Sequence, residues 1–334
     1  MRLRAAARMP GYVGFSRPRP YDQTPARLQS EKMAKVGIML EGQEGLNWER
    51  WRRICLDTDA LGFDSLRRSD HLISLMGAPE RDCIETWASL ALAAEWTKRI
   101  QFGPMVSPMT FRHPAILAKM AASVDILSGG RVILGVGAGW NENEHMMFGV
   151  PFFTEKERFD RLEQGIHAMR ETWNRSNPKP VHNPMPLLMG GKGKKRTLPI
   201  VAREASEWNV SRLDLELYKD GRQVLEASCR EIGRDPGSIR HSIMAGFLIG
   251  RDRSELRERA AQVSSIVRDL NGMTPDDVIE NRKQAWFVGT PEEIAERMRG
   301  IATLGVDLFM LQHWLLDDAD ALKLLAEQVL PAVA

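Results

Sequence analysis

Residues 128–151 read SGGRVILGVGAGWNENEHMMFGVP, and this stretch decides which fold we expect. Its apolar run, residues 132–136, is short, rich in β-branched side chains and bounded by glycines, which is typical of a strand buried on both faces. The glycines at its far end let a flat ligand or a phosphate approach the backbone closely. A polar loop, residues 141–145, follows at once. A buried strand that leads into such a loop is typical of a ligand site at the mouth of a barrel.

The same glycines could belong to a dinucleotide-binding fingerprint, and this alternative must be tested first. Gly135, Gly137 and Gly139 alternate with other residues, but the fingerprint requires its third glycine elsewhere. The acidic residue expected about 20 positions later is present as Asp160. It lies within a helical pattern, however, and not at the end of a second strand. The sequence therefore disfavours a dinucleotide site of this kind.

The composition of the 334 residues is ordinary for a globular protein, with 43% hydrophobic and 27% charged residues. A formal net charge of +2 gives no reason to expect a nucleic acid as partner. The chain has no run of about 18 apolar residues, so we expect no membrane span. Its 3 scattered cysteines, without a CxxC pair, favour reduced thiols in the cytoplasm and give no sign of a metal site.

The first 33 residues differ from the rest because they are basic, rich in proline and arginine, and without an apolar core. They also lack the apolar segment of a secretory signal. We interpret residues 1–33 as a disordered extension, or as the result of an upstream start codon with Met33 as the usual first residue. Residues 34–334 are predicted to form a single domain with a polar insertion near 251–284.

From residue 34 onward, short apolar runs alternate with amphipathic helical patterns, and neither half of the chain is richer in strands or helices. Eight such units predict an α/β fold, the (β/α)8 TIM barrel. A doubly wound sheet is the alternative, but it normally has fewer strands and a clear switch point. In a barrel, the residues that follow each strand are the functional candidates. We expect strands at 34–40, 65–69, 100–105, 132–136, 186–189, 207–210, 242–249 and 308–311, and capped helices that begin at Thr154 and Thr290.

Polar residues follow the second and third expected strands. His71 can stack on a planar ring or transfer a proton near neutral pH, and Asp70 would orient it. The alternative is that Ser69 or Asp70 merely caps the next segment. Arg112 can hold an anionic group with its planar fork, whereas His113 precedes a proline and is expected in an extended loop.

The fourth and fifth strands are followed by further candidates. Asn141 and Asn143 offer donors and acceptors to a flat heterocycle. Residues 190–196, GGKGKKR, lead directly into a helix, whose free N–H groups favour a phosphate. A solvated basic turn is the alternative, and the loop is not a P-loop because Lys195 stands at the Ser/Thr position. Since no HExxH or GxSxG motif occurs, we expect a cofactor to carry the chemistry.

Several motifs in combination resemble the luciferase-like monooxygenase superfamily. The resemblance extends from about Met33 to the C-terminus and is closest to the branch that uses the deazaflavin coenzyme F420. It implies a TIM barrel of the bacterial luciferase-like type, with the flavin or deazaflavin ring lying across its mouth. The motifs are GFDSL at 62–66, SDH at 69–71, SGGR at 128–131, GWN at 139–141, RFD at 158–160, the segment 186–210 and FVGTPE at 287–292.

The resemblance implies roles for the residues near the ring. Asp70 and His71 would contact it, with His71 as the proton donor or acceptor and Asp70 as its partner. The bond Met105–Val106 matches the position of a non-prolyl cis peptide that backs the ring. Asn141 or Asn143 would reach the polar edge of the ring.

At the phosphate end, Gly190 and Gly191 would hold the ribityl phosphate. The basic loop that includes Lys192 and Gly193 suits the long anionic tail of F420, which riboflavin phosphate lacks. Arg67 departs from the pattern, because the family usually has an apolar residue at this position. It puts the packing of the second expected strand in doubt, since an unpaired buried charge is costly.

We therefore expect an oxidoreductase that transfers hydride between coenzyme F420 and a small organic substrate, in the cytoplasm and as a homodimer. An FMN-dependent monooxygenase with the same site residues is the alternative. A third hypothesis, from another class, is a non-catalytic flavin-binding or assembly protein. It would require a pocket that cannot admit a substrate beside His71.

Overall fold

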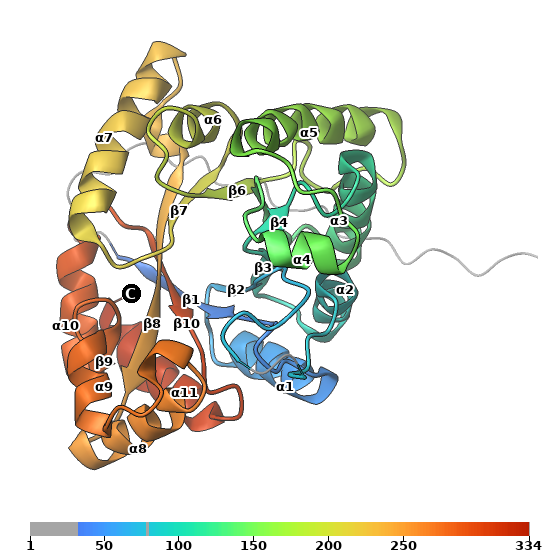
Figure 1. Cartoon of the computed structure of the whole chain (residues 1–334). Coiled ribbons are helices and arrows are strands. Elements are labelled where there is room, and N and C mark those ends of the chain that lie inside the picture. The colour runs from blue at the N-terminus through green and yellow to red at the C-terminus, as the bar shows by residue number, and fades with distance from the viewer. Residues whose placement is uncertain (1–32, 78–79, 334) are drawn as a thin grey trace, which may run out of the picture. The chain divides into compact units, whose positions relative to one another are not determined.

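The computed structural model describes residues 33–77 and 80–333, whose strands form one parallel sheet that curls into a barrel (Figure 1). The hydrogen-bonded order is β3-β2-β1-β10-β8-β7-β6-β5-β4, and β9 pairs with β8 beside this path. The barrel closes where Phe102 bridges Val132 and where the N–H of Ile133 donates to the carbonyl of Phe102 at 3.0 Å. The predicted TIM barrel is therefore confirmed, with β3 and β4 sharing one of its eight strand positions. The strands are β1 Lys35–Leu40, β2 Ser65–Arg68, β3 Gln101–Pro104, β4 Ser107–Pro108, β5 Leu134–Gly137, β6 Leu187–Gly190, β7 Glu207–Val210, β8 Arg240–Ile249, β9 Phe287–Gly289 and β10 Leu308–Gln312.

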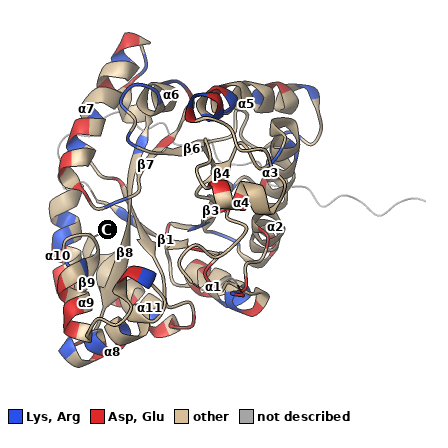
Figure 2. Ribbon diagram, viewed as in Figure 1, with Lys and Arg blue, Asp and Glu red and all other residues tan. Residues whose placement is uncertain are grey.

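Helices surround the strands as an outer layer (Figure 1). Charged residues lie mainly on these helices and on the loops, whereas the strands are largely uncharged (Figure 2). Within the described part of the chain, no helix combines the length and the apolar character needed to cross a membrane. The helices are α1 Trp48–Ala60, α2 Thr86–Trp96, α3 Pro114–Ser128, α4 Glu142–Met147, α5 Glu155–Arg175, α6 Thr197–Glu204, α7 Leu215–Glu231, α8 Arg253–Ser264, α9 Pro275–Arg282, α10 Pro291–Ala302, α11 Ala319–Leu324, the π-helical turn Leu325–Val329 and α12 Leu330–Val333.

The predicted helix starts at Thr154 and Thr290 are confirmed as N-caps of α5 and α10. Each threonine accepts from the backbone of the glutamate three residues later, and that glutamate bonds back to the cap. The resulting capping boxes satisfy N–H groups that the first turn leaves free. Several elements had no predicted range, among them the 17-residue α7, the short α4, the strands β4 and β9, and the helices α8 and α9 within the predicted insertion.

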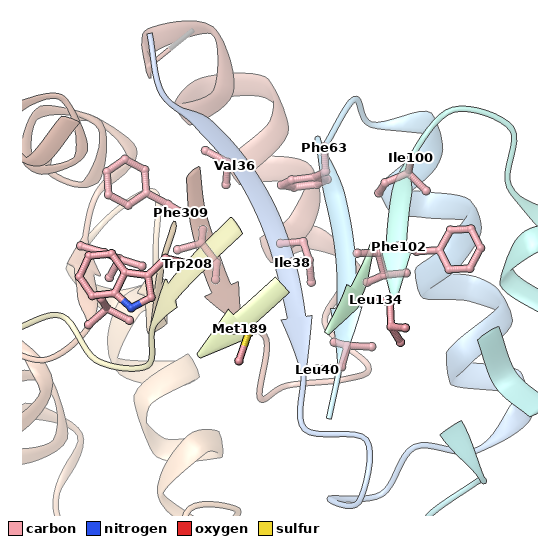
Figure 3. Packing of buried hydrophobic residues seen from close by; sticks show 14 of the residues in the cluster. Val36, Ile38, Leu40, Phe63, Ile100, Phe102, Leu134, Met189, Trp208 and Phe309 are labelled. Carbon is pink, nitrogen blue, oxygen red and sulfur yellow. The ribbon is translucent and has the colours of Figure 1, made fainter. Parts of the chain in front are cut away.

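The core has two layers, one outside the barrel wall and one within it. Along β1, Val36, Ile38 and Leu40 are buried in the cluster between strands and helices (Figure 3). Met39, between them in sequence, belongs instead to a cluster inside the barrel. This alternation follows from the period of two in a strand. Each such buried aliphatic side chain contributes about 1.5–3 kcal/mol.

Two glycines permit the barrel to close between β3 and β5. A Cβ atom at Gly103 would lie 2.0 Å from the carbonyl oxygen of Ile133, and one at Gly135 would lie 2.1 Å from that of Pro104. Real Cβ atoms do not approach backbone atoms so closely. Only residues without a Cβ therefore fit this seam.

Arg67, the unexpected charge in β2, is fully buried inside the barrel. Its Nη2 lies 3.5 Å from Oε2 of Glu207 on β7, which is also buried. The hydroxyl of Ser242 donates to the other oxygen of Glu207 at 2.8 Å. The charge of Arg67 thus faces a carboxylate across the barrel, but its Nε and Nη2 make no hydrogen bond and burial lowers its pKa, so the pairing offsets only part of the cost of burial.

Candidate active site at the mouth of the barrel

A cavity of about 1460 Å³, here called the mouth cavity, opens at the carboxyl ends of the strands. Its lining includes residues that follow β2, β5, β7 and β10, so distant parts of the sequence meet there. Of the sequence-predicted site residues, His71, Met105, Val106, Gly190 and Gly191 line it. This volume exceeds the usual range for a small ligand and is enough for a large cofactor with a substrate beside it.

His71 lines the mouth cavity and has a buried carboxylate as its partner. Its Nδ1 lies 2.7 Å from Oε2 of Glu144, a residue of α4 that is fully buried. The other oxygen of Glu144 accepts from the backbone N–H of Leu72 at 2.7 Å. A carboxylate can only accept, so this contact places a proton on Nδ1 and leaves Nε2 for proton exchange.

The environment of His71 raises its pKa. Burial alone would lower the pKa of the imidazole, because it disfavours the charged form. The hydrogen bond and the negative charge of Glu144, aided by Glu41 and Asp70, outweigh burial, and the net pKa lies above the ordinary 6.5. His71 is therefore held by carboxylates in a state that can both accept and donate a proton near neutral pH.

Asp70 does not pair with His71, contrary to the sequence-based expectation. Its Oδ2 accepts from the hydroxyl of Ser107 at 2.5 Å and from Nη1 of Arg112 at 2.6 Å, and its Oδ1 accepts from Nη2 of Arg112 at 3.1 Å. Arg112, expected to hold an anion, also bonds Glu85 at 2.6 Å. A forked guanidinium offers Asp70 a stronger bidentate bond than an imidazole can. Asp70 is 1% exposed and does not line the mouth cavity.

The peptide bond between Met105 and Val106 is cis, as the resemblance implied. It separates β3 from β4, and both residues line the mouth cavity. A Cβ atom at Gly137, on the neighbouring β5, would lie 2.6 Å from a methyl carbon of Val106. The absence of a side chain at Gly137 therefore makes room for Val106 beside the cis peptide bond.

Asn141 and Asn143 are placed differently from the expectation. The side chain of Asn141 accepts from the N–H of Glu144 at 3.2 Å as the N-cap of α4, and its carbonyl bonds Nδ1 of His145 at 2.6 Å. Asn143 is exposed on the same helix. Neither lines the mouth cavity, and their expected contact with a cofactor ring stays a prediction. The expected polar loop is a helix that positions Glu144.

The loop after β6 supplies the other end of the mouth cavity. Gly191 has φ of +119°, a conformation that favours glycine. At the neighbouring Gly190, a Cβ atom would meet only the carbonyl oxygen of Asn209, at 3.7 Å, so the space beside it is open. Lys192 and Gly193 follow and are exposed, beyond the lining of the cavity. Helix α6 then begins without a side-chain cap hydrogen bond, but the N–H of Leu198 already donates to the carbonyl of Gly193 at 3.0 Å and Pro199 has no N–H. Of its first three residues, only Thr197 therefore has an N–H left for an anion.

The basic side chains of this loop are partly neutralised. Lys194 pairs with Asp220 at 3.1 Å, and Arg196 pairs with Asp160 at 2.6 Å. Within the described residues, Lys192 has no ion pair. The loop therefore retains positive charge for a ligand, but less than its sequence suggests.

Sequence reasoning missed two features of the mouth cavity. Glu144 was read as part of a polar loop, although an acidic residue so close to the expected strand end was a possible signal. Trp286 and Trp314 line the cavity from the end of the insertion and from the segment after β10, and no local pattern indicated them. Among the described residues, no three of His, Cys, Asp or Glu are grouped as a metal ion would require.

The family model described as luciferase-like monooxygenase matches residues 33–308. The chain therefore belongs to this family, which contains oxidoreductases and monooxygenases, and the match covers most of the barrel.

Relatives of this chain use either flavin or deazaflavin. An FMNH2-dependent dimethylsulfone monooxygenase of Pseudomonas putida is 26% identical over 78% of this chain and 81% of its own length. An F420-dependent glucose-6-phosphate dehydrogenase of Amycolatopsis mediterranei is 39% identical over 36% of each chain. The chain spans about half, 52%, of uncharacterised proteins of Mycobacterium bovis and Mycobacterium tuberculosis, at 32% identity.

Among solved structures, an F420-dependent secondary alcohol dehydrogenase in complex with an F420–acetone adduct has the same fold. It superposes with a TM-score of 0.75 at 20% identity and covers 90% of this chain and 99% of its own. Together these likenesses establish the luciferase-like barrel, while the reaction and the coenzyme of this chain remain to be proposed.

Proposed function

We propose that this protein transfers a hydride between coenzyme F420 and a small organic substrate, with His71 as the proton donor or acceptor. The observation that carries the proposal is the pairing of His71, in the wall of the mouth cavity, with the buried carboxylate of Glu144 at 2.7 Å. A histidine so held has one nitrogen committed to orientation and one left for chemistry.

The residues present fit a ring with a phosphorylated tail. Met105 and Val106 would lie against the ring, and Gly190 and Gly191 would allow the phosphate to approach the backbone near α6. When bound, the deazaflavin supplies a carbon that accepts or gives up a hydride. Lys192, exposed at this end, would favour the longer anionic tail of F420.

The protein's own part in the reaction is proton transfer and exclusion of water. In alcohol oxidation, neutral Nε2 of His71 accepts the hydroxyl proton as the hydride leaves carbon and the carbonyl forms. In the reverse direction the protonated ring returns that proton to the oxygen. Glu144 keeps the ring oriented and stabilises its charged form in both directions.

An FMN-dependent monooxygenase is the second candidate. It is favoured by the dimethylsulfone monooxygenase, a relative that aligns along most of this chain. The partial neutralisation of the basic loop by Asp160 and Asp220 also weakens the argument for a polyanionic tail.

Titration of the purified protein with F420 and with FMN, followed by fluorescence, separates the two candidates. Tight binding of F420 alone supports the first, tight binding of FMN alone supports the second, and binding of neither refutes both. With the cofactor that binds, His71→Ala should slow turnover far more than it weakens cofactor affinity. His167→Ala, at an exposed position of α5, is the matched control and should change neither. Equal losses of turnover and of cofactor affinity in His71→Ala would mean that the histidine only contacts the cofactor as part of the cavity wall and does not transfer a proton.

A further inference from the structure

Two tryptophans form an aromatic wall of the mouth cavity. Trp286 and Trp314 stack with their ring centroids 6.2 Å apart and their planes 6° from parallel. Both are about nine-tenths buried, yet both line the mouth cavity. We call them the tryptophan wall. Their spacing leaves no room for a further ring between them, so a ligand would meet the wall from the cavity side.

The backbone of β8 is shaped to accept this wall. A Cβ atom at Gly246 would lie 2.3 Å from Cδ2 and from Cε2 of Trp286, so the indole rests directly on the strand. Gly246 pairs in register with Gln312 of β10, whose side chain donates to Glu41 at 2.7 Å. Gly246, Gln312 and Glu41 all line the mouth cavity, so its surface is continuous from the wall toward the carboxylates around His71.

The tryptophan wall has apolar neighbours on one side. Both tryptophans belong to one buried cluster with Val267 and Leu270 of the segment between α8 and α9. Val267 and Ala285 also line the mouth cavity. The insertion also contributes Asp269, Arg282 and Gln284 to the lining, so the apolar surface offered to a ligand consists of the two tryptophans with Val267 and Ala285.

The cations near the wall are already engaged. Arg282 pairs with Asp269 at 2.5 Å, and its guanidinium lies 5.1 Å from the ring centroid of Trp286. Arg297 donates to the carbonyls of Lys283, Gln284 and Trp286 at 2.6–2.7 Å. The charge of Arg282 is therefore balanced by Asp269, although its Nε has no hydrogen-bond partner, and Arg297 uses Nη1 and Nη2 for backbone carbonyls.

The reacting end disfavours an anion as well. Glu144 bonds His71 and Glu41 lines the mouth cavity, whereas the charge of Asp70 is paired with Arg112. A second negative charge beside His71 would be repelled and would lose hydration without a compensating partner.

We infer that the substrate is a neutral, mainly apolar molecule with a flat aromatic or cyclic part held by the tryptophan wall and one hydroxyl or carbonyl group that reaches His71. This inference rests on the proposed redox function of the same site. In the oxidising direction the carbinol C–H bond breaks with its electron pair passing to the coenzyme. The O–H proton passes to His71, and the C=O bond forms.

The test uses the full-length protein, with F420 binding measured first and on its own. Failure to bind the coenzyme would refute the proposed function, whereas the following measurements address the substrate class. The probes are 1-phenylethanol, 2-propanol and glucose 6-phosphate, supplied with oxidised F420, whose absorbance falls on reduction. We expect kcat/KM to be highest for 1-phenylethanol and lowest for the sugar phosphate. Higher kcat/KM for glucose 6-phosphate, or no turnover of 1-phenylethanol with the coenzyme bound, would overturn the inference.

Substitutions of Trp286 test whether the tryptophan wall holds the substrate. Trp286→Ala should raise KM for 1-phenylethanol about tenfold, the effect of about 1.4 kcal/mol of lost aromatic contact, with little change in kcat or in F420 affinity. Trp286→Phe keeps a ring and should restore most of the loss, which distinguishes lost contact from a failure to fold. Trp48→Ala, at a partly exposed tryptophan of α1, is the control and should leave KM unchanged. An unchanged KM in Trp286→Ala would also overturn the inference.

Discussion

Replacement of Glu144 by glutamine tests the arrangement of the site without a cofactor or a substrate. Glutamine keeps one oxygen and replaces the other by an NH2 group, so it can accept from the N–H of Leu72 or from Nδ1 of His71 but not from both, and it removes the negative charge. A hydrogen bond to a charged group is worth roughly 1.5–3 kcal/mol, and one between neutral groups about 0.5–1.5 kcal/mol. The variant should therefore lose about 1–2 kcal/mol of the free energy of unfolding while His71 is protonated.

The sign of the pH dependence follows from the raised pKa of His71. A group whose pKa is higher in the folded protein contributes stability that is complete below its unfolded value, about 6.5 for histidine. That contribution is lost as the pH rises through the folded pKa. The difference between wild type and Glu144→Gln should accordingly be largest at pH values below 6.5 and shrink on the alkaline side.

The assay is urea unfolding at several pH values, with the free energy extrapolated to water. Glu142→Gln is the matched control, because it removes the same charge from an exposed position of the same helix. Equal effects of the two substitutions, or a difference that does not change with pH, would refute the ion pair. In turnover assays, Glu144→Gln should also move the inflection assigned to His71 toward lower pH, because the charge that raises its pKa is gone.

Two further predictions concern the barrel itself and are read by the same unfolding assay. Gly135→Ala should destabilise by about 1–3 kcal/mol or more, because its Cβ would lie 2.1 Å from the carbonyl oxygen of Pro104 and the strands would have to separate. Gly300→Ala, in α10 with open space around it, should instead stabilise by about 0.5–1 kcal/mol. Equal effects of the two substitutions would contradict the close contact between β3 and β5 at Gly135. Arg67→Met should cost about 3–5 kcal/mol by leaving Glu207 charged and buried alone, and Glu207→Gln in the same chain should recover much of it. Additive losses in the double variant would show that the two residues are not coupled.

Local pattern was enough to predict the repeating architecture of this protein. The eight strand positions follow from short apolar runs bounded by glycine, and the starts of α5 and α10 follow from capping boxes at Thr154 and Thr290. Each of these signals depends only on residues that are close together in the sequence, so it can be recognised without the tertiary structure. The cis bond at Met105 came from the family resemblance and is present in the structure.

The partners within the site were decided only by the tertiary structure. His71 and Glu144 are separated by 73 positions, and Asp70 and Arg112 by 42, so no spacing rule relates them. Which carboxylate contacts the imidazole of His71 depends on where each strand ends relative to its neighbours. Closure of the barrel fixes these positions. Trp286 likewise reaches the cavity because β8 carries a glycine beneath it, a fit between surfaces that the order of residues does not encode locally.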